Sequence, residues 1–199
     1  IVSGNFLQLG PKQICSVDGN TVSCAKSTSE WYLLNALRYN DKQASTKQVN
    51  AISSYLKIDA TTGRLYLTAD NGTTPSGGTV PYGFTDITLP TGTSINQNTV
   101  GKYIKTLIFP PATATSSGYA VNIYPSGNKL KQVLGTMNTG TTPGTVTFSA
   151  SSDIAAIAAI NYDATNDRME LNAKSNVLAV ANISDKKVRF IDFTNPNGP

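Results

Sequence analysis

Residues Tyr119–Tyr124 (YAVNIY), followed by Pro125–Asn128 (PSGN), indicate the fold most clearly. The first segment is rich in aromatic and β-branched residues, which is typical of a β-strand. The second is a sequence typical of a tight β-turn. The same alternation of short apolar segments with turn-rich clusters recurs from about residue 57 onward. It predicts further strands at residues 65–67, 84–89, 103–109, 145–148, 177–180 and 188–193.

Seven or more short strands with such turns predict a mainly β fold, an antiparallel β-sandwich of the Greek-key or jelly-roll type. The chain has 199 residues, enough for one such domain with an additional arm. We expect residues 1–26 to form an extended N-terminal arm with a disulfide loop, and residues 27–199 to form the β-sandwich domain. Residues 152–160 fit either a short helix or a strand of small residues.

A short N-terminal helical segment is expected within residues 27–57. Ser27 and Glu30 have the spacing of a capping box, and a similar pattern begins at Ser45. Each precedes apolar residues at helical spacing, so the segment predicts two short helices. The residues that carry this spacing are Trp31, Leu34, Leu37, Val49, Ile52 and Leu56.

Residues 1–10 (IVSGNFLQLG) are apolar and uncharged, and they partly alternate as a strand does. Such a segment must pair as a strand within its own fold or within a neighbouring molecule. We expect it to enter the core of a neighbouring copy. The side chains expected at that subunit interface are Val2, Phe6, Leu7 and Leu9.

Cys15 and Cys24 flank the turn sequence Asp18-Gly19-Asn20, so their sulfur atoms could meet across a small hairpin. A disulfide here predicts an oxidising compartment. The first residue is Ile, and a removed signal peptide is the simplest expectation for it. Asn71 and Asn182 each begin an Asn-x-Ser/Thr pattern and are possible glycosylation sites. These features predict an extracellular or cell-surface protein.

The composition argues against most catalytic classes. The chain contains no His, which removes Ser-His-Asp and Cys-His nucleophile systems and imidazole metal ligands. No cofactor motif is present, so we expect no enzyme activity, no cofactor and no metal site. Lys and Arg are scattered rather than arranged in a stripe, so no nucleic-acid partner is expected. No apolar run is long enough to span a membrane.

A self-assembling structural role fits the composition better. Charged residues form only 14% of the chain, while Thr, Ser and Asn number 25, 18 and 18. Low charge reduces repulsion between copies stacked side by side. We therefore predict the structural subunit of an extracellular, pilus-like filament, a homopolymer that grows by donating its N-terminal strand to the next copy. A viral capsid, spike or tail protein is the first alternative.

A secreted adhesin or carbohydrate-binding module is the second alternative. It would recognise a host-surface glycan or receptor through exposed aromatic side chains. Candidates are Tyr82, Tyr119 and Tyr124, although each of these is also a typical core or cross-strand residue. Trp31 has the same two interpretations: a core residue covering the sheet, or a sugar-stacking residue.

Two segments of the chain echo each other. Residues 59–67 (DATTGRLYL) and 163–171 (DATNDRMEL) share the pattern Asp-Ala-Thr-x-x-Arg-apolar-x-Leu. Each predicts a polar turn that leads into a strand, because Asp and Thr side chains can bond to the turn backbone. The pattern indicates a reused hairpin, and a pair of related ligand loops is the alternative.

Overall fold

The computed structural model describes residues 6–8, 13–18, 21–26, 30–40, 49–70, 83–112, 116–137, 146–196 and 198. Side chains are described from residue 30 onward, apart from 38–40, 49–51 and 70. This part of the chain is mainly β, and every strand pair within it is antiparallel. Its helices are one turn of α1 (Val100–Tyr103) and the short 3₁₀ helix η1 (Ala155–Ile157). Among the described residues, no helix has the length and apolarity that crossing a membrane requires.

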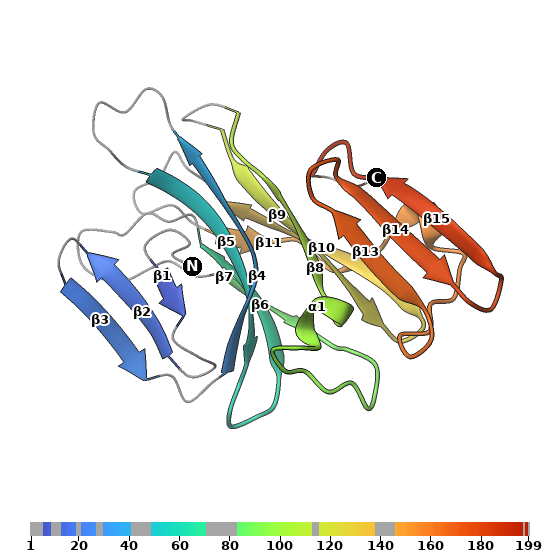
Figure 1. Ribbon diagram of the computed structural model, residues 1–199, viewed down its shortest axis with the longest axis horizontal. Coiled ribbons are helices and arrows are strands. Elements are labelled where there is room, and N and C mark those ends of the chain that lie inside the picture. Colours follow the sequence, from blue (N-terminus) through green and yellow to red (C-terminus); the bar gives the residue numbers. More distant parts are fainter. Residues whose placement is uncertain are drawn as a thin grey trace.

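The strands are grouped in sheets by position in the chain (Figure 1). The N-terminal sheet contains β1 (Phe6–Gln8), β2 (Gln13–Asp18) and β3 (Thr21–Lys26). The next sheet contains β4 (Glu30–Asn40), β5 (Val49–Ile58), β6 (Leu65–Asp70) and β7 (Gly83–Ile87). The central sheet contains β8 (Lys105–Phe109), β9 (Gly118–Ser126), β10 (Lys129–Met137), β11 (Val146–Phe148) and β12 (Ser152–Asp153). The C-terminal sheet contains β13 (Arg168–Asn172), β14 (Val177–Asn182) and β15 (Lys187–Asp192).

The strand order corrects one part of the predicted topology. A Greek key places strands beside each other that are distant in sequence. In the described sheets, by contrast, hydrogen-bonded neighbours follow one another along the chain, except that β12 also pairs with β10. Short turns explain this order. β9 and β10, for example, are joined by Gly127 and Asn128, and Gly127 has a φ of 58°, which a two-residue hairpin loop requires. The sheets are therefore meanders.

The helical prediction for residues 27–57 is wrong over the described residues, because β4 and β5 occupy them. Ile52 and Leu56 lie four residues apart, and such positions share a face in a helix and in a strand alike. In β4, Trp31 and Tyr32 are both buried, and a register shift follows at Leu33. These features remove the two-residue alternation that would have indicated a strand.

The strands predicted from alternation lie where expected, including 119–124 within β9 and 188–193 overlapping β15. The segment 152–160 contains both of its predicted alternatives, since the short strand β12 is followed by η1. The prediction missed β10, whose mixed apolar and polar residues pair along the whole of β9.

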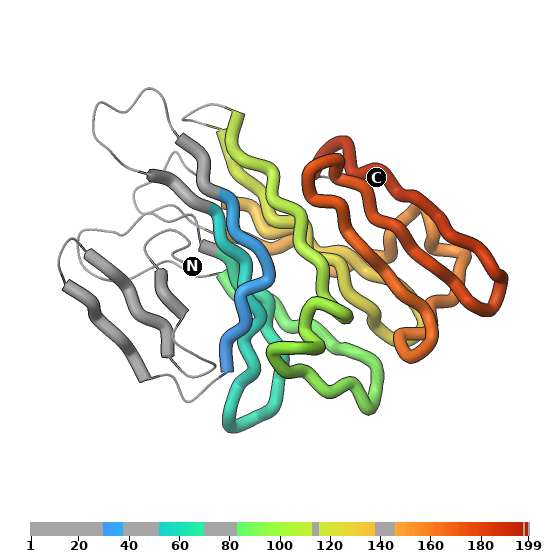
Figure 2. Tube along the Cα trace, viewed as in Figure 1, coloured from blue at the N-terminus to red at the C-terminus, as the bar shows by residue number. Residues whose placement is uncertain are grey.

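The central sheet lies between two others (Figure 2). Residues on one face of β9 pack with β4–β7, and residues on the other face pack with β13–β15. β9 is consequently buried on both faces. The cluster toward β4–β7 includes Tyr32, Leu56, Leu67, Ile87, Tyr124 and Val133. The cluster toward β13–β15 includes Leu107, Val121, Ile123, Met169, Leu178, Val180 and Ile191.

A polar group lies inside the first of these interfaces. Asn122 is fully buried, and its side-chain oxygen accepts hydrogen bonds from the hydroxyls of Ser54, at 3.0 Å, and Thr106, at 2.7 Å. Asn35 donates from its amide to the Thr106 carbonyl at 2.8 Å. Buried polar groups are stable when they are hydrogen-bonded, and here the bonds join strands of two sheets. The network therefore favours one alignment of these sheets.

In the N-terminal sheet, the register places Cys15 directly opposite Cys24. Opposite positions in an antiparallel pair have a Cα separation that a disulfide can span. The disulfide itself stays a prediction. Phe6 and Leu7 of the predicted donor arm lie in β1, which pairs with β2 of the same chain. Val2 and Leu9 lie outside the described residues.

Candidate functional site

The C-terminal sheet carries the three most exposed large apolar side chains among the described residues. Alternate residues of β15 point away from the core. Val188 is 58% exposed and Phe190 is 75% exposed, while Ile191, which packs into the core, is 4% exposed. At the adjacent turn, Ile183 is 61% exposed. Together they place three large apolar side chains in solvent at one side of the molecule.

The strand register extends this apolar surface onto β14. Val188 lies opposite Ala181, and Phe190 lies opposite Ala179. Both alanines are half-buried and present only a methyl group. On β13, the corresponding positions hold the exposed residues Arg168 and Glu170. The face is therefore apolar toward β15 and charged toward β13, and we call the apolar half, Ala179, Ala181, Val188 and Phe190, the β15 face.

Asparagine turns hold these strands in place. Asn172 accepts hydrogen bonds from the backbone N–H groups of Lys174 and Ser175, at 3.1 and 3.3 Å. Asn176, four residues after Asn172, has a positive φ of 57°. Asparagine suits both positions, because its side chain bonds to the turn backbone and it tolerates the left-handed conformation.

The turn from β14 to β15 repeats this arrangement. Asn182 accepts hydrogen bonds from the Ser184 hydroxyl and the Asp185 backbone N–H, and Lys186 has a φ of 55°. The predicted turns at Asp59 and Asp163 belong to the same type. Each carboxylate accepts the backbone N–H two residues later, at 3.1 and 2.8 Å.

These turn contacts perturb the aspartates. Hydrogen bonds from Thr62 and Thr61 lower the pKa of Asp59, and hydrogen bonds from Thr165 and Asn166 lower that of Asp163. The carboxylates are thus used to hold turns. This favours the reused-hairpin interpretation of the echo over that of two ligand loops.

One buried carboxylate joins the ends of the C-terminal sheet. Asp167 is 2% exposed and accepts hydrogen bonds from the backbone N–H of Asp163 and of Ile183, both at 2.8 Å. It also accepts one from the Asn182 amide at 2.7 Å. Burial, reinforced by the charge of Asp167, raises the pKa of Tyr162 above its ordinary value. Three donors on a single carboxylate indicate a structural anchor rather than a catalytic base.

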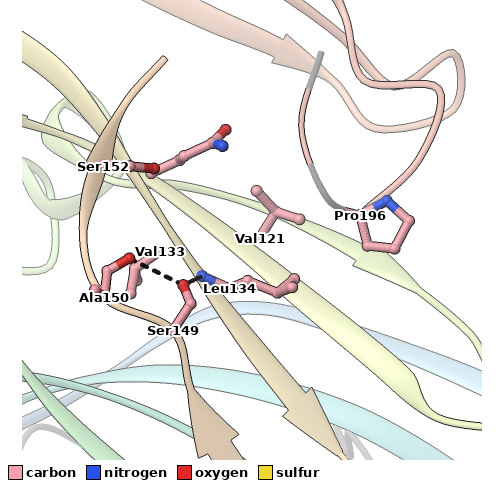
Figure 3. A pocket seen from close by; sticks show the side chains of 8 residues that line it. Val121, Val133, Leu134, Ser149, Ala150, Ser152 and Pro196 are labelled. Atoms are coloured by element: carbon pink, nitrogen blue, oxygen red, sulfur yellow. Dashed lines mark hydrogen bonds between the residues drawn. The ribbon is translucent and has the colours of Figure 1, made fainter. Parts of the chain in front are cut away.

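A small pocket lies at the edge of the central sheet, with a volume of about 240 Å³ (Figure 3). Its lining contains no titratable side chain. The Ser149 hydroxyl accepts a hydrogen bond from the Leu134 N–H and donates one to the Ala150 carbonyl, so no base lies against it. Within the described part of the chain, the buried Gln132 oxygen has no hydrogen-bond partner. The pocket has room for a few polar atoms, and no titratable side chain in its lining could activate the hydroxyls of Ser149 and Ser152.

The aromatic residues considered for sugar binding are mostly buried. Trp31 is 8% exposed, and it makes edge contacts with Tyr55 and Phe84. Tyr124 is 2% exposed, and its hydroxyl lies 2.8 Å from that of Ser151. Tyr119 is half-buried, and Tyr82 lies outside the described residues. An exposed ring face is needed for sugar stacking, so Trp31 and Tyr124 do not suit it.

The two glycosylation patterns have different outcomes. Asn182 is 3% exposed, and its amide nitrogen donates to Asp167 and to the Asn161 carbonyl. A glycan on this nitrogen would displace both hydrogen bonds, which argues against modification of Asn182, and glycosylation there stays a prediction. Asn71 lies outside the described residues.

Sequence reasoning did not identify Val188 and Phe190 as surface residues. A signal was present, because Val188-Arg189-Phe190-Ile191-Asp192 alternates and one of its faces must point outward. The alternation could not say which face. No protein-family model, curated protein or solved structure matches this chain, so its function is inferred from the geometry of the described residues.

Proposed function

We propose that this chain is the structural subunit of an extracellular filament and that its main partner is another copy of itself. The β15 face carries this proposal. Contiguous apolar surface on a folded domain marks a site of association with another molecule. The strands that form this face belong to a sheet held by buried contacts and by asparagine turns.

Two further features support an assembled structural role. The β4–β7 and β8–β12 sheets share buried side chains, as the two layers of the predicted β-sandwich would, with β13–β15 as an additional layer. Such a layered β domain presents broad faces and strand edges to its neighbours. The opposed positions of Cys15 and Cys24 support an oxidising, extracellular setting.

The N-terminal arm supplies a second proposed contact. Residues 6–8 pair with β2 of the same chain. If β1 of one copy paired with β2 of another, the same hydrogen bonds would join the two copies, as in domain swapping. In a filament this strand donation would act as the head-to-tail contact, and apolar residues of the arm would be buried in the next subunit.

Deletion of residues 1–10 tests the filament proposal. We expect the deleted protein to fold, as judged by circular dichroism, and to form no filaments under negative-stain electron microscopy. The full-length chain serves as the reference under the same conditions. Normal filaments from the deleted protein would rule out strand donation, and a full-length chain that stays monomeric at every concentration would rule out the structural role.

A further inference from the structure

Strand β15 has one open edge. It pairs with β14 on one side and ends the strand order of its sheet. Among the described residues, no backbone hydrogen bond outside β14 reaches residues 187–192. An open edge presents N–H and C=O groups that can pair with another strand. Its apolar side chains lie on the same strand, so the edge and the β15 face form one continuous surface.

The charges at the ends of this edge are complementary to each other. Lys186 precedes the strand and Asp192 ends it, and both side chains are exposed. Neither forms an ion pair with any described residue. If the strand ran antiparallel to a second copy of itself, each end would meet the other end of the partner. The basic end of each copy would then lie beside the acidic end of the other, so the favourable contact would form at both ends of the pair.

Symmetry restricts the possible registers. In a two-fold antiparallel pair, one residue lies opposite its own copy, and residues at equal distances on either side lie opposite each other. With Arg189 at the centre, Val188 lies opposite Phe190 of the partner subunit, and Lys186, in the turn just before the strand, comes close to the partner's Asp192. With Phe190 at the centre, Val188 would lie opposite the partner's Asp192. Of these two registers, only the first places apolar residues opposite each other on the outward face and brings a basic residue close to an acidic one; on the inner face it places Lys187 opposite the partner's Ile191.

The Arg189-centred register places two guanidinium groups opposite each other on the inner face. Each is already paired, because Arg189 forms an ion pair with Asp185 of its own chain. This pairing lowers the pKa of Asp185 and keeps it ionised. The repulsion between the two Arg189 groups is thereby reduced. The cross-strand pairs on the outward face then decide the register.

We propose that two copies of this chain associate edge to edge through β15, in antiparallel register about Arg189, to form one continuous six-stranded sheet. This inference rests on the proposed self-association and names its contact. The partner's β15 then pairs along the open edge, and Phe190 lies beside the partner's Val188 on the outward face of the joined sheet. A two-fold contact joins copies in pairs, so filament growth also requires the second contact proposed for the N-terminal arm.

A pair of single substitutions tests the location of the contact. Phe190→Asp removes the central apolar side chain, which is 75% exposed. Ile183→Asp removes an apolar side chain at the turn, outside the paired strand, which is 61% exposed. We expect Phe190→Asp to raise the dimer dissociation constant in sedimentation velocity by roughly tenfold or more. Ile183→Asp should change it by less than about threefold. Equal effects of the two substitutions, or no effect of Phe190→Asp, would overturn the proposal.

Charge reversal tests the register. Lys186→Glu and Asp192→Lys should each weaken the dimer, because each places like charges opposite one another. The double variant restores opposite charges and should return the dissociation constant to within about threefold of the wild-type value. Failure of the double variant to recover would overturn the Arg189-centred register.

The outcomes separate this inference from the proposed function. If the wild-type chain assembles and Phe190→Asp assembles equally well, self-association stands and the β15 contact is wrong. If the wild-type chain does not associate at any concentration, both are wrong. Circular dichroism of each variant shows whether the monomer is folded, and the exposure of Phe190 and Ile183 makes both substitutions tolerable to the fold.

Discussion

Strands β9 and β15 are both rich in apolar residues, yet their surroundings are opposite. β9 is an inner strand of the middle layer, and its residues from Ala120 to Pro125 are all buried. β15 is an edge strand of the last layer, and only Ile191 is buried within it. Apolar sequence therefore serves two purposes in this chain. In β9 it stabilises the fold, and in β15 part of it remains available to another molecule.

The largest expected difference between the two strands is in stability. Ile123 of β9 is fully buried, and Ile123→Ala should lower the free energy of unfolding by about 2–5 kcal/mol. Val188 of β15 is exposed, and Val188→Ala should lower it by less than about 0.5 kcal/mol. Urea denaturation of dilute, monomeric protein measures both. Similar losses at the two positions would contradict the assigned layers.

The buried carboxylate of the C-terminal sheet gives the next effect. Asp167→Asn replaces an acceptor oxygen with an amide that faces N–H donors, so it should cost about 1.5–3 kcal/mol of unfolding free energy. Asp153→Asn is the control, because Asp153 forms only a partly exposed ion pair with Lys131. That pair contributes no more than about 1 kcal/mol. If the two substitutions lower the free energy of unfolding equally, Asp167 does not anchor the C-terminal sheet.

The hydrogen-bond network around Asn122 predicts a smaller stability effect, at the contact between the β4–β7 and β8–β12 sheets. Asn122→Leu leaves the buried hydroxyls of Ser54 and Thr106 without their acceptor, and we expect a loss of about 1–2 kcal/mol. Adding Ser54→Ala and Thr106→Val should recover much of this loss, because the hydroxyl groups are then absent. Thermal unfolding of the single and triple variants measures the recovery. A triple variant less stable than the single one would contradict it.

The smallest effect is a pH dependence at the turn before β13. The folded-state pKa of Asp163 lies below its ordinary value, so its contribution to stability is present above about pH 4. It is lost as the pH falls through the folded pKa. Asp163→Asn should flatten the decline of the melting temperature below pH 4. An unchanged decline would show that the turn hydrogen bonds do not depend on the carboxylate.

The sequence predicts some of these features well and others poorly, for physical reasons. Strands 177–180 and 188–193 were predictable because turn residues bound them and their side chains alternate. β5 was not, because residues 52–56 are all buried and do not alternate. β4 was not, because Trp31 and Tyr32 are both buried and a register shift follows at Leu33. Nothing in the sequence says that Arg189, rather than Phe190, points inward. That orientation depends on the Asp185 ion pair and on the pairing with β14.

Amide hydrogen exchange at low and high protein concentration tests whether the edge of β15 binds a second copy, because it compares β9 and β15 in one experiment. The buried amides of β9 should exchange slowly at both concentrations. We expect the amides of residues 187–192 to become markedly more protected at high concentration, as the open edge of β15 pairs with a second copy. Protection of β15 that does not change with concentration, in protein that self-associates, would contradict the account.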